Sequence, residues 1–136
     1  MKKVLFDINI WIDIALRRGQ FPESTALFQR LLDKGSAIGF PLSGFTTFYY
    51  LLTRGLGKAE AIRFIQDASA SIIYCPFTEK EHELALKLNL SDLEDACVVA
   101  CGFLSGFNTV VTRNKKDFKT ELVSSKTPSE LLAEWH

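Results

Sequence analysis

The chain has 136 residues, of which 47% are hydrophobic and 12% aromatic, and its sixteen basic residues balance sixteen acidic ones. This size and apolar content exclude intrinsic disorder and predict one domain spanning residues 1–136 with a single packed core. Because the net charge is zero, the whole molecule has no general attraction for nucleic acid, and any such activity must come from a local site.

The first apolar run and the cysteines predict where the protein resides. Residues 1–6 briefly imitate a signal peptide, but aspartates soon interrupt the run and no small-residue cleavage site follows. Cys75, Cys97 and Cys101 are odd in number and lie in apolar surroundings, which is typical of reduced thiols. Cys97 and Cys101 could share a soft metal, but no Cys or His lies nearby in sequence to complete such a site. We expect a cytoplasmic protein without a membrane span.

Apolar runs and helical periodicity alternate along the chain. Short apolar or β-branched runs predict strands at residues 4–6, 36–40, 71–75 and 109–112, with 122–123 as a candidate fifth strand. Amphipathic spacing, caps and stop signals predict helices at residues 8–16, 22–34, 45–53, 58–68, 78–88, 91–106 and from 127 onward. Strands separated by helices need crossover connections. The predicted fold is therefore α/β and three-layered, with a mainly parallel central sheet of four or five strands flanked by helices.

Three of the predicted helices begin with a capping box. Thr78–Glu81, Ser91–Glu94 and Thr127–Glu130 each place a hydroxyl residue three positions before a glutamate. In such a box the hydroxyl accepts from the backbone at the glutamate, and the glutamate accepts from the backbone at the hydroxyl residue. The last box also has proline at the first helical position, which is a preferred place for it.

Three aspartates fall at or near the carboxyl edge of the predicted sheet, where ligands of parallel sheets gather. Asp7 directly follows the first strand, Asp117 follows the fourth strand by five residues, and Asp95 lies in the first turns of the helix that leads into the fourth strand. Oxygen donors without zinc-type Cys and His spacing favour Mg²⁺ or Mn²⁺. Alternatively, Asp7 could be only a helix N-cap and Asp117 only a loop residue.

Asp95 is the most informative of these aspartates. It precedes the run 96–104, which is apolar all round and predicts a buried helix. A carboxylate beside such a helix is costly to bury without a positive charge or good hydrogen bonds, which favours a functional role for Asp95. Glu94 fits a capping box and is interpreted as complementing the helix dipole. Asp92 could do the same or, three residues before Asp95, face the same centre.

In this order, these segments resemble the PIN domain family, specifically its toxin-like members related to VapC-type ribonucleases. The motifs are VLFDINIWID at residues 4–13, DLEDA at 92–96 and VTRNKKDF at 111–118, of which the last is the most specific. The resemblance extends from Lys3 to the last helix. It implies a parallel sheet with helices around it, and an acidic cluster that binds Mg²⁺ or Mn²⁺ and cleaves RNA.

The resemblance can be carried over residue by residue. Asp7 matches the first metal-binding aspartate of the family, and Asp95 matches its later, helical one. Asn114 falls near the fourth acidic position, where some members carry Asp, and Asp117 is the alternative carboxylate in the same loop. Asn9 matches a polar residue that supports the first aspartate. We therefore expect Asp7 and Asp95 to bind the metal and these loop residues to complete the catalytic group.

One departure from the family pattern bears on activity. Many members carry a glutamate on the helix after the second strand, and Thr47 stands about where that glutamate would be. The resemblance then implies a site that binds metal more weakly, uses Asp92 as a substitute, or has lost activity. A related branch of the family, with an aromatic pair in this segment, shows the same lack.

The predicted function is that of a metal-dependent ribonuclease, the toxin of a toxin–antitoxin pair, with RNA as substrate, a small antitoxin as partner and a homodimeric assembly. Asp117 or Asp92 would orient the attacking water or act as base. Arg113, Lys115 and Lys116 either bind flanking phosphates or belong to a solvated loop.

Two other function classes remain open. One is a PIN-fold module that binds protein or RNA without efficient catalysis, which the absent glutamate favours. The other is a phosphatase of the haloacid dehalogenase type, because Asp7 follows a first strand. That chemistry needs a second aspartate two positions later, and Asn9 cannot transfer the proton.

Overall fold

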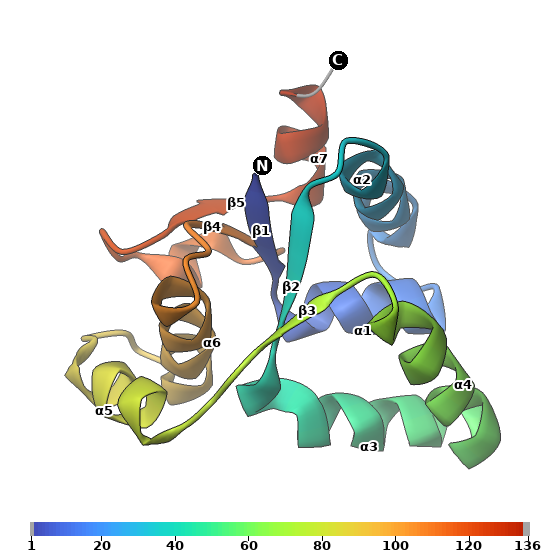
Figure 1. The fold of residues 1–136 in the computed structure, drawn as a ribbon, viewed down its shortest axis with the longest axis horizontal. Coiled ribbons are helices and arrows are strands. Elements are labelled where there is room, and N and C mark those ends of the chain that lie inside the picture. The colour runs from blue at the N-terminus through green and yellow to red at the C-terminus, as the bar shows by residue number, and fades with distance from the viewer. Residues whose placement is uncertain (1, 135–136) are drawn as a thin grey trace.

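A fully parallel five-stranded sheet forms the centre of the computed structural model, which describes residues 2–134 (Figure 1). Its strands are β1 (Lys3–Phe6), β2 (Ala37–Pro41), β3 (Ile73–Cys75), β4 (Thr109–Val111) and β5 (Ser124–Lys126). They lie in the order β3-β2-β1-β4-β5, so that β1 is central, with Val4 opposite Ile38 on one side and Thr109 on the other. The predicted α/β fold with a mainly parallel sheet is confirmed.

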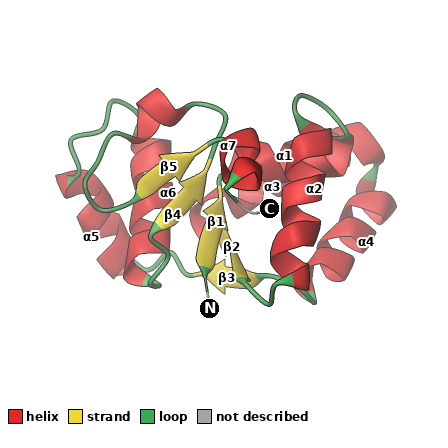
Figure 2. Cartoon of the chain, turned by 90° about the horizontal axis from the view of Figure 1, so that it is seen from above, coloured by secondary structure: helices red, strands yellow, loops and turns green. Residues whose placement is uncertain are grey.

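Helices cover both faces of this sheet (Figure 2). The helices are α1 (Ile8–Leu16), α2 (Phe21–Asp33), α3 (Phe45–Leu56), α4 (Lys58–Ser69), α5 (Glu79–Lys87), α6 (Leu93–Leu104) and α7 (Pro128–Ala133). Two 3-10 turns, η1 (Leu42–Gly44) and η2 (Lys115–Phe118), follow β2 and β4. Figures 1 and 2 place α5 and α6 on one side of the sheet and α1 to α4 on the other. None of the helices between residues 2 and 134 has the length and apolarity that a bilayer crossing requires.

The strand alternation of β1 divides the core into two parts, because successive side chains of a strand point to opposite faces. Phe6 packs against Trp11 of α1, with ring centroids 5.1 Å apart, and Trp11 in turn contacts Phe40. Leu5 points to the other face and packs with Phe107 among residues of α6 and β4. The strand is thus buried on both faces, as its continuous apolar run predicts.

Two of the three predicted capping boxes are confirmed. Thr78 and Thr127 are N-caps, and each makes both reciprocal bonds with the glutamate three residues later. The box predicted at Ser91 is wrong by one residue, because Asp92 is the N-cap of α6 and its carboxylate accepts the backbone bonds. This shift moves Glu94 out of the capping position.

The fifth strand lies two residues later than predicted. Leu122 and Val123 pack into the core beside Leu5 and Phe107, and pairing with β4 begins at Ser124, opposite Thr109. Their apolarity marks the core contact rather than the ladder, because backbone pairing needs no apolar side chain. The cysteines are free thiols, with Cys75 and Cys101 buried.

Gly39 of β2 lies close to the side chains packed on the α6 side of the sheet. A Cβ added there would lie 2.8 Å from the Phe107 ring and 2.9 Å from Leu5 Cδ1. Both neighbours are fully buried and cannot move into solvent. We expect Gly39→Ala to lower the free energy of unfolding by about 1–3 kcal/mol through overpacking, as measured by urea denaturation. Phe107→Leu in the same chain should recover part of that loss, and an unchanged urea midpoint for Gly39→Ala would contradict the close approach.

Candidate active site

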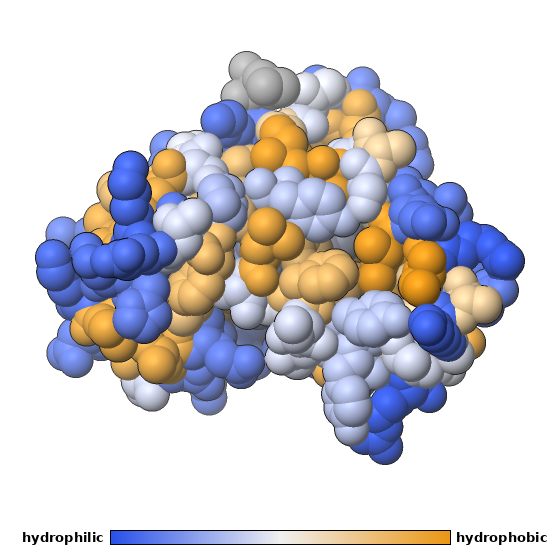
Figure 3. Space-filling view, turned by 60° about the horizontal axis from the view of Figure 1, so that its bottom comes forward, coloured by the Kyte–Doolittle hydropathy of each residue, from blue (hydrophilic) through white to orange (hydrophobic). Residues whose placement is uncertain are grey.

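A cavity of about 170 Å³ opens at the carboxyl edge of the sheet, between α6 on one side and α1, η1 and α3 on the other. Its polar lining consists of Asp7, Asn9, Ser43, Thr47, Glu94 and Asp95. Figure 3 shows this face of the molecule hollowed between the α5–α6 side and α3, with hydrophilic residues gathered towards both ends of the molecule. Segments far apart in the sequence thus meet where parallel sheets place their ligands.

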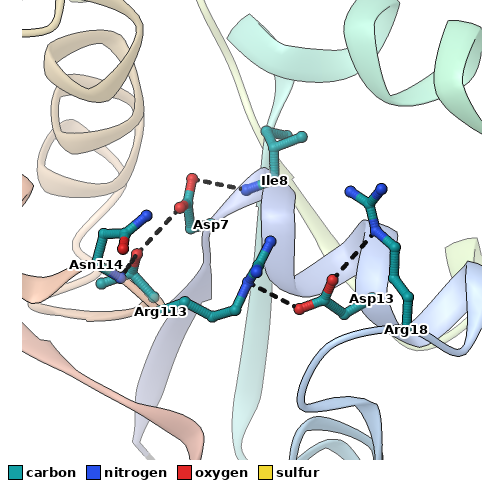
Figure 4. A network of polar contacts seen from close by, with 7 residues as sticks. Asp7, Ile8, Asp13, Arg18, Arg113 and Asn114 are labelled. Carbon is teal, nitrogen blue, oxygen red and sulfur yellow. Dashed lines mark hydrogen bonds and ion pairs between the residues drawn. The ribbon is translucent and has the colours of Figure 1, made fainter.

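Asp7 is held rigidly at the junction of β1 and α1. It is the N-cap of α1, and its Oδ1 accepts a 2.8 Å hydrogen bond from the backbone N–H of Ile8. Its Oδ2 accepts a 3.1 Å bond from the hydroxyl of Thr112, the residue that follows β4 (Figure 4). Only 5% of Asp7 is exposed. The N-cap interpretation of Asp7 is therefore correct, and the same geometry directs its carboxylate towards the cavity.

The charge on Asp7 is poorly compensated. Burial raises its pKa to about 6, although the Thr112 and Ile8 hydrogen bonds and the nearby Arg113 guanidinium pull the pKa down. Glu94 raises the pKa further through its negative charge. A carboxylate in this state gains from a nearby cation, which would replace the lost hydration.

Asp95 shares this electrostatic environment from the first turn of α6. Its pKa is raised to about 7, mainly by burial and then by the negative charges of Asp7, Asp92, Asp117 and Glu94. Helix α6 packs against both η1 and η2, which sets its first turn beside the other acidic segments. Asp7 and Asp95 therefore line one cavity, while Asp117 influences Asp95 by its charge without lining the cavity itself.

Asp92 and Glu94 exchange the roles that the sequence indicates for them. Asp92 Oδ1 accepts bonds from the backbone N–H groups of Glu94 (2.8 Å) and Asp95 (3.3 Å), so Asp92 caps the helix. Glu94 lines the cavity and raises the pKa of both Asp7 and Asp95. The sequence analysis missed Glu94 because it assigned the N-cap of this helix to Ser91. With the N-cap placed one residue later, Glu94 would have been a candidate for the cavity.

The loop after β4 supports Asp7 through a chain of hydrogen bonds. The backbone N–H of Asn114 donates to the Thr112 hydroxyl (3.2 Å), which donates to Asp7. The Asp117 N–H in turn donates to the Asn114 carbonyl (3.0 Å). Asn114 thus acts on the site through its backbone, and Thr112, which is fully buried, is a site residue that the sequence analysis missed.

Two of the three predicted basic residues of this loop, Arg113 and Lys115, already form ion pairs. Arg113 Nε lies 3.0 Å from the carboxylate of Asp13, which is fully buried on α1, and Lys115 Nζ lies 2.9 Å from Glu130. Lys116 is exposed. The sequence analysis did not single out Asp13, whose burial and pairing depend on contacts from other parts of the chain.

The donor atoms around the cavity suit a hard divalent cation. They are carboxylate, hydroxyl and amide oxygens, which Mg²⁺ and Mn²⁺ prefer, and two of the carboxylates have pKa values raised mainly by burial. Within residues 2–134, however, no three Asp, Glu, His or Cys side chains converge tightly enough to form a ready-made metal site. The fit therefore rests on the Asp7–Asp95 pair with neutral oxygens beside it.

Thr47 forms part of the wall that α3 contributes to the cavity. It lines the same cavity as Asp7 and Asp95, together with Ser43 from η1. The residue expected to stand near the family's glutamate position thus lies at this cavity and contributes a hydroxyl to it. The cavity is therefore less negative on its α3 side than on its α6 side.

Comparisons with known proteins agree with this architecture. A family model described as a PIN domain matches residues 3–116. Among solved structures, the chain is similar to a chain in the crystal structure of VapBC2 from Rickettsia felis bound to a DNA fragment from their promoter. The TM-score is 0.72, with 14% sequence identity over 92% of this chain and 98% of that one, so this similarity concerns the fold. The search of curated proteins returned no match.

The raised pKa of Asp95 makes a prediction about stability. The folded state holds this proton up to about pH 7, whereas the ordinary value is 3.8, so the free energy of unfolding falls as the pH rises through that interval. Asp95→Asn removes the penalty. In the presence of a chelator we expect its thermal midpoint to exceed the wild-type midpoint at about pH 8 and to match it near pH 4.

The control for this experiment is Glu121→Gln, which makes the same charge change on an exposed loop residue. It should show no such pH-dependent gain. A lower midpoint for Asp95→Asn at both pH values would contradict the uncompensated charge in the cavity.

Proposed function

The chain belongs to the PIN domain family, and from this premise we propose that it is a metal-dependent endoribonuclease that hydrolyses RNA phosphodiester bonds as the toxin of a toxin–antitoxin pair. Members of this family are nucleases. The observation that carries the proposal is the meeting of Asp7 and Asp95 in one cavity, with both pKa values raised towards neutrality.

Asp7 and Asp95 would hold Mg²⁺ or Mn²⁺. When bound, the ion would supply positive charge for the phosphate and lower the pKa of a water molecule. Thr112 and the N–H of Ile8 fix the Asp7 carboxylate, so that little reorganisation is needed on binding. Asn9 and Ser43 line the same cavity and would add neutral oxygen ligands.

Asp117 is the stronger of the two candidates for orienting the attacking water. Asp92 Oδ1 is already bound to two backbone N–H groups, and this capping role restrains the carboxylate. Asp117 is half-buried in η2, and its charge reaches Asp95. A proton acceptor must lie within hydrogen-bond reach of the proton that it takes, directly or through one water molecule. Asn114 would set the position of this loop.

The basic residues of the same loop would contact RNA phosphates. Lys116 is an exposed residue of η2. The pair between Lys115 and Glu130 is largely exposed and therefore weak, so Lys115 can exchange Glu130 for a phosphate. Arg113 directly follows Thr112, which binds Asp7, and its charge already acts on that carboxylate.

A second candidate function is that of a PIN-fold module that binds RNA or protein with weak or no catalysis. Thr47 at the cavity and the absence of a preformed three-ligand cluster within residues 2–134 favour it. The RNA cleavage assay below separates this module from the nuclease.

A small antitoxin is the proposed protein partner. The similar crystal structure contains VapBC2 on promoter DNA, and we extend that arrangement to this chain as a proposal. Large apolar side chains are exposed on α3, α5 and α6, including Tyr50 (58%), Leu86 (60%) and Leu93 (56%). Such side chains would be buried in an antitoxin complex or in the expected homodimer.

Asp7→Asn and Asp95→Asn should each abolish Mg²⁺-dependent cleavage of single-stranded RNA. Asn caps a helix as well as Asp does, so Asp7→Asn should keep the fold. Mn²⁺ at a hundredfold excess over its Kd should stabilise the wild type by about 2.7 kcal/mol in thermal unfolding, and neither variant by a comparable amount. Cleavage retained by both variants in a preparation free of other nucleases would contradict the assignment, as would equal Mn²⁺ shifts in all three proteins.

Thr47→Glu should strengthen the site by returning a carboxylate to the α3 wall of the cavity. We expect Mn²⁺ to bind roughly tenfold more tightly, because carboxylate number tunes the affinity for hard cations. Isothermal titration calorimetry measures this change. Thr46→Glu is the matched control, since Thr46 is the exposed neighbour on the same helix and does not line the cavity. Equal Mn²⁺ affinities for the two variants would show that position 47 does not reach the metal.

A further inference from the structure

A fully buried carboxylate near the end of α1 joins two arginines from distant parts of the chain. Asp13 is 0% exposed, and it lies outside the cavity described above. Its Oδ1 is 3.4 Å from Arg18 Nε and its Oδ2 is 3.0 Å from Arg113 Nε (Figure 4). One negative charge therefore meets two positive charges. Burial raises the pKa of Asp13; with this carboxylate ionised, the Asp13–Arg18–Arg113 triad, defined by these three residues, carries a net charge of +1 beside the acidic cavity.

The turn after α1 is shaped around the Asp13 carboxylate. Arg17 ends the helix in the left-handed conformation (φ 54°), and the Arg18 N–H donates to the Asp13 carbonyl at 3.1 Å. Gly19 also has positive φ (57°), and a Cβ there would lie 3.0–3.2 Å from the Asp13 carboxyl group. A side chain at position 19 would thus press on the carboxylate. The local conformation brings Arg18 over Asp13 while leaving Arg17 on the surface.

Arg113 connects the triad to the candidate active site. It directly follows Thr112, whose hydroxyl binds Asp7. In Figure 4 the Arg113 side chain extends between the carboxyl groups of Asp7 and Asp13. Its positive charge also acts on Asp7. The triad is therefore positioned immediately beside the carboxylate that is proposed to hold the metal.

Both arginines keep donors that the carboxylate does not use. Each contacts Asp13 through Nε, and their side chains are 47% (Arg18) and 34% (Arg113) exposed. Figure 4 shows the terminal nitrogens of Arg18 pointing away from Asp13. A guanidinium group paired only through Nε keeps its terminal N–H groups for other acceptors, and their planar arrangement suits the oxygens of a phosphate. One arginine would be enough to neutralise Asp13, so the second leaves an excess of positive charge.

We propose that Arg18 and Arg113, held in place by Asp13, form a binding subsite for backbone phosphates of single-stranded RNA beside the scissile bond. The proposal rests on the RNA cleavage proposed above and adds Arg18 and Asp13 to it. Asp13 is a positioning residue that does not touch the RNA. It reduces the freedom that the arginines would otherwise lose on binding.

Paired substitutions of neighbouring arginines test the subsite. The Kd of a short fluorescent oligouridylate is measured by anisotropy, with a chelator present to prevent cleavage, over a series of salt concentrations. Arg18→Gln should weaken binding and reduce the slope of log K against log salt by about 0.7, the value for one phosphate contact on a single strand. Arg17→Gln makes the same charge change one residue earlier and should leave that slope unchanged.

Asp13→Asn tests the positioning role by the sign of its effect. The variant loses one negative charge, so a purely electrostatic effect would tighten RNA binding. If Asp13 positions the arginines, binding weakens instead. Arg18→Lys keeps the charge but loses the planar donors, and its affinity should fall between those of the wild type and Arg18→Gln. Arg18→Lys also retains a charge partner for Asp13, so it tests the subsite even if Asp13→Asn does not fold.

The outcomes separate this proposal from the proposed function. A wild type that cleaves RNA, with equal slopes for Arg17→Gln and Arg18→Gln, overturns the subsite and leaves the nuclease assignment standing. Tighter binding by folded Asp13→Asn overturns the positioning role. A wild type that neither binds nor cleaves RNA overturns both proposals. A loss confined to the Arg18 variants and folded Asp13→Asn supports the subsite.

Discussion

The carboxylate of Asp7 is the constraint around which this molecule is arranged. It stands where the central strand β1 ends and α1 begins, almost without exposure to water, and it is fixed by Ile8 from its own helix and Thr112 from the neighbouring strand. Two hydrogen bonds do not offset the lost hydration, as its raised pKa shows. The fold thus holds an incompletely compensated carboxylate at a fixed point, and such a point favours the binding of a cation.

The surrounding elements add negative charge on one side of Asp7 and positive charge on the other. Helix α6 brings Asp95 and Glu94 into the same cavity as Asp7, where burial and then the charges of Asp7 and its acidic neighbours raise the pKa of Asp95. The loop after β4 places Arg113 on the opposite side of Asp7, held by buried Asp13. A metal ion at the reacting phosphate of RNA would meet the acidic surface. The neighbouring phosphates would meet the basic surface beside it. Both surfaces would be preorganised by the rigid sheet edge between them.

The wall contributed by α3 is the uncharged side of the cavity. Thr47 supplies a hydroxyl to the cavity, and Glu94 supplies a carboxylate at the α6 side of the same cavity. The acidity of the site is therefore distributed towards α6. A metal bound there would depend more on the start of α6 than on α3. The residue at which α6 begins therefore matters for the proposed function.

The sequence by itself determined the order of the elements, the parallel sheet, two capping boxes and the positions of Asp7 and Asp95, because hydrophobic period and capping chemistry act between residues close along the chain. It misplaced the start of α6 by one residue and the last strand by two, since several nearby residues can satisfy the same local rule. Only the tertiary structure decided that Thr112 binds Asp7 and that Arg113 meets Asp13. These contacts join residues about a hundred positions apart, and their formation depends on sheet order and helix packing, which no local period encodes.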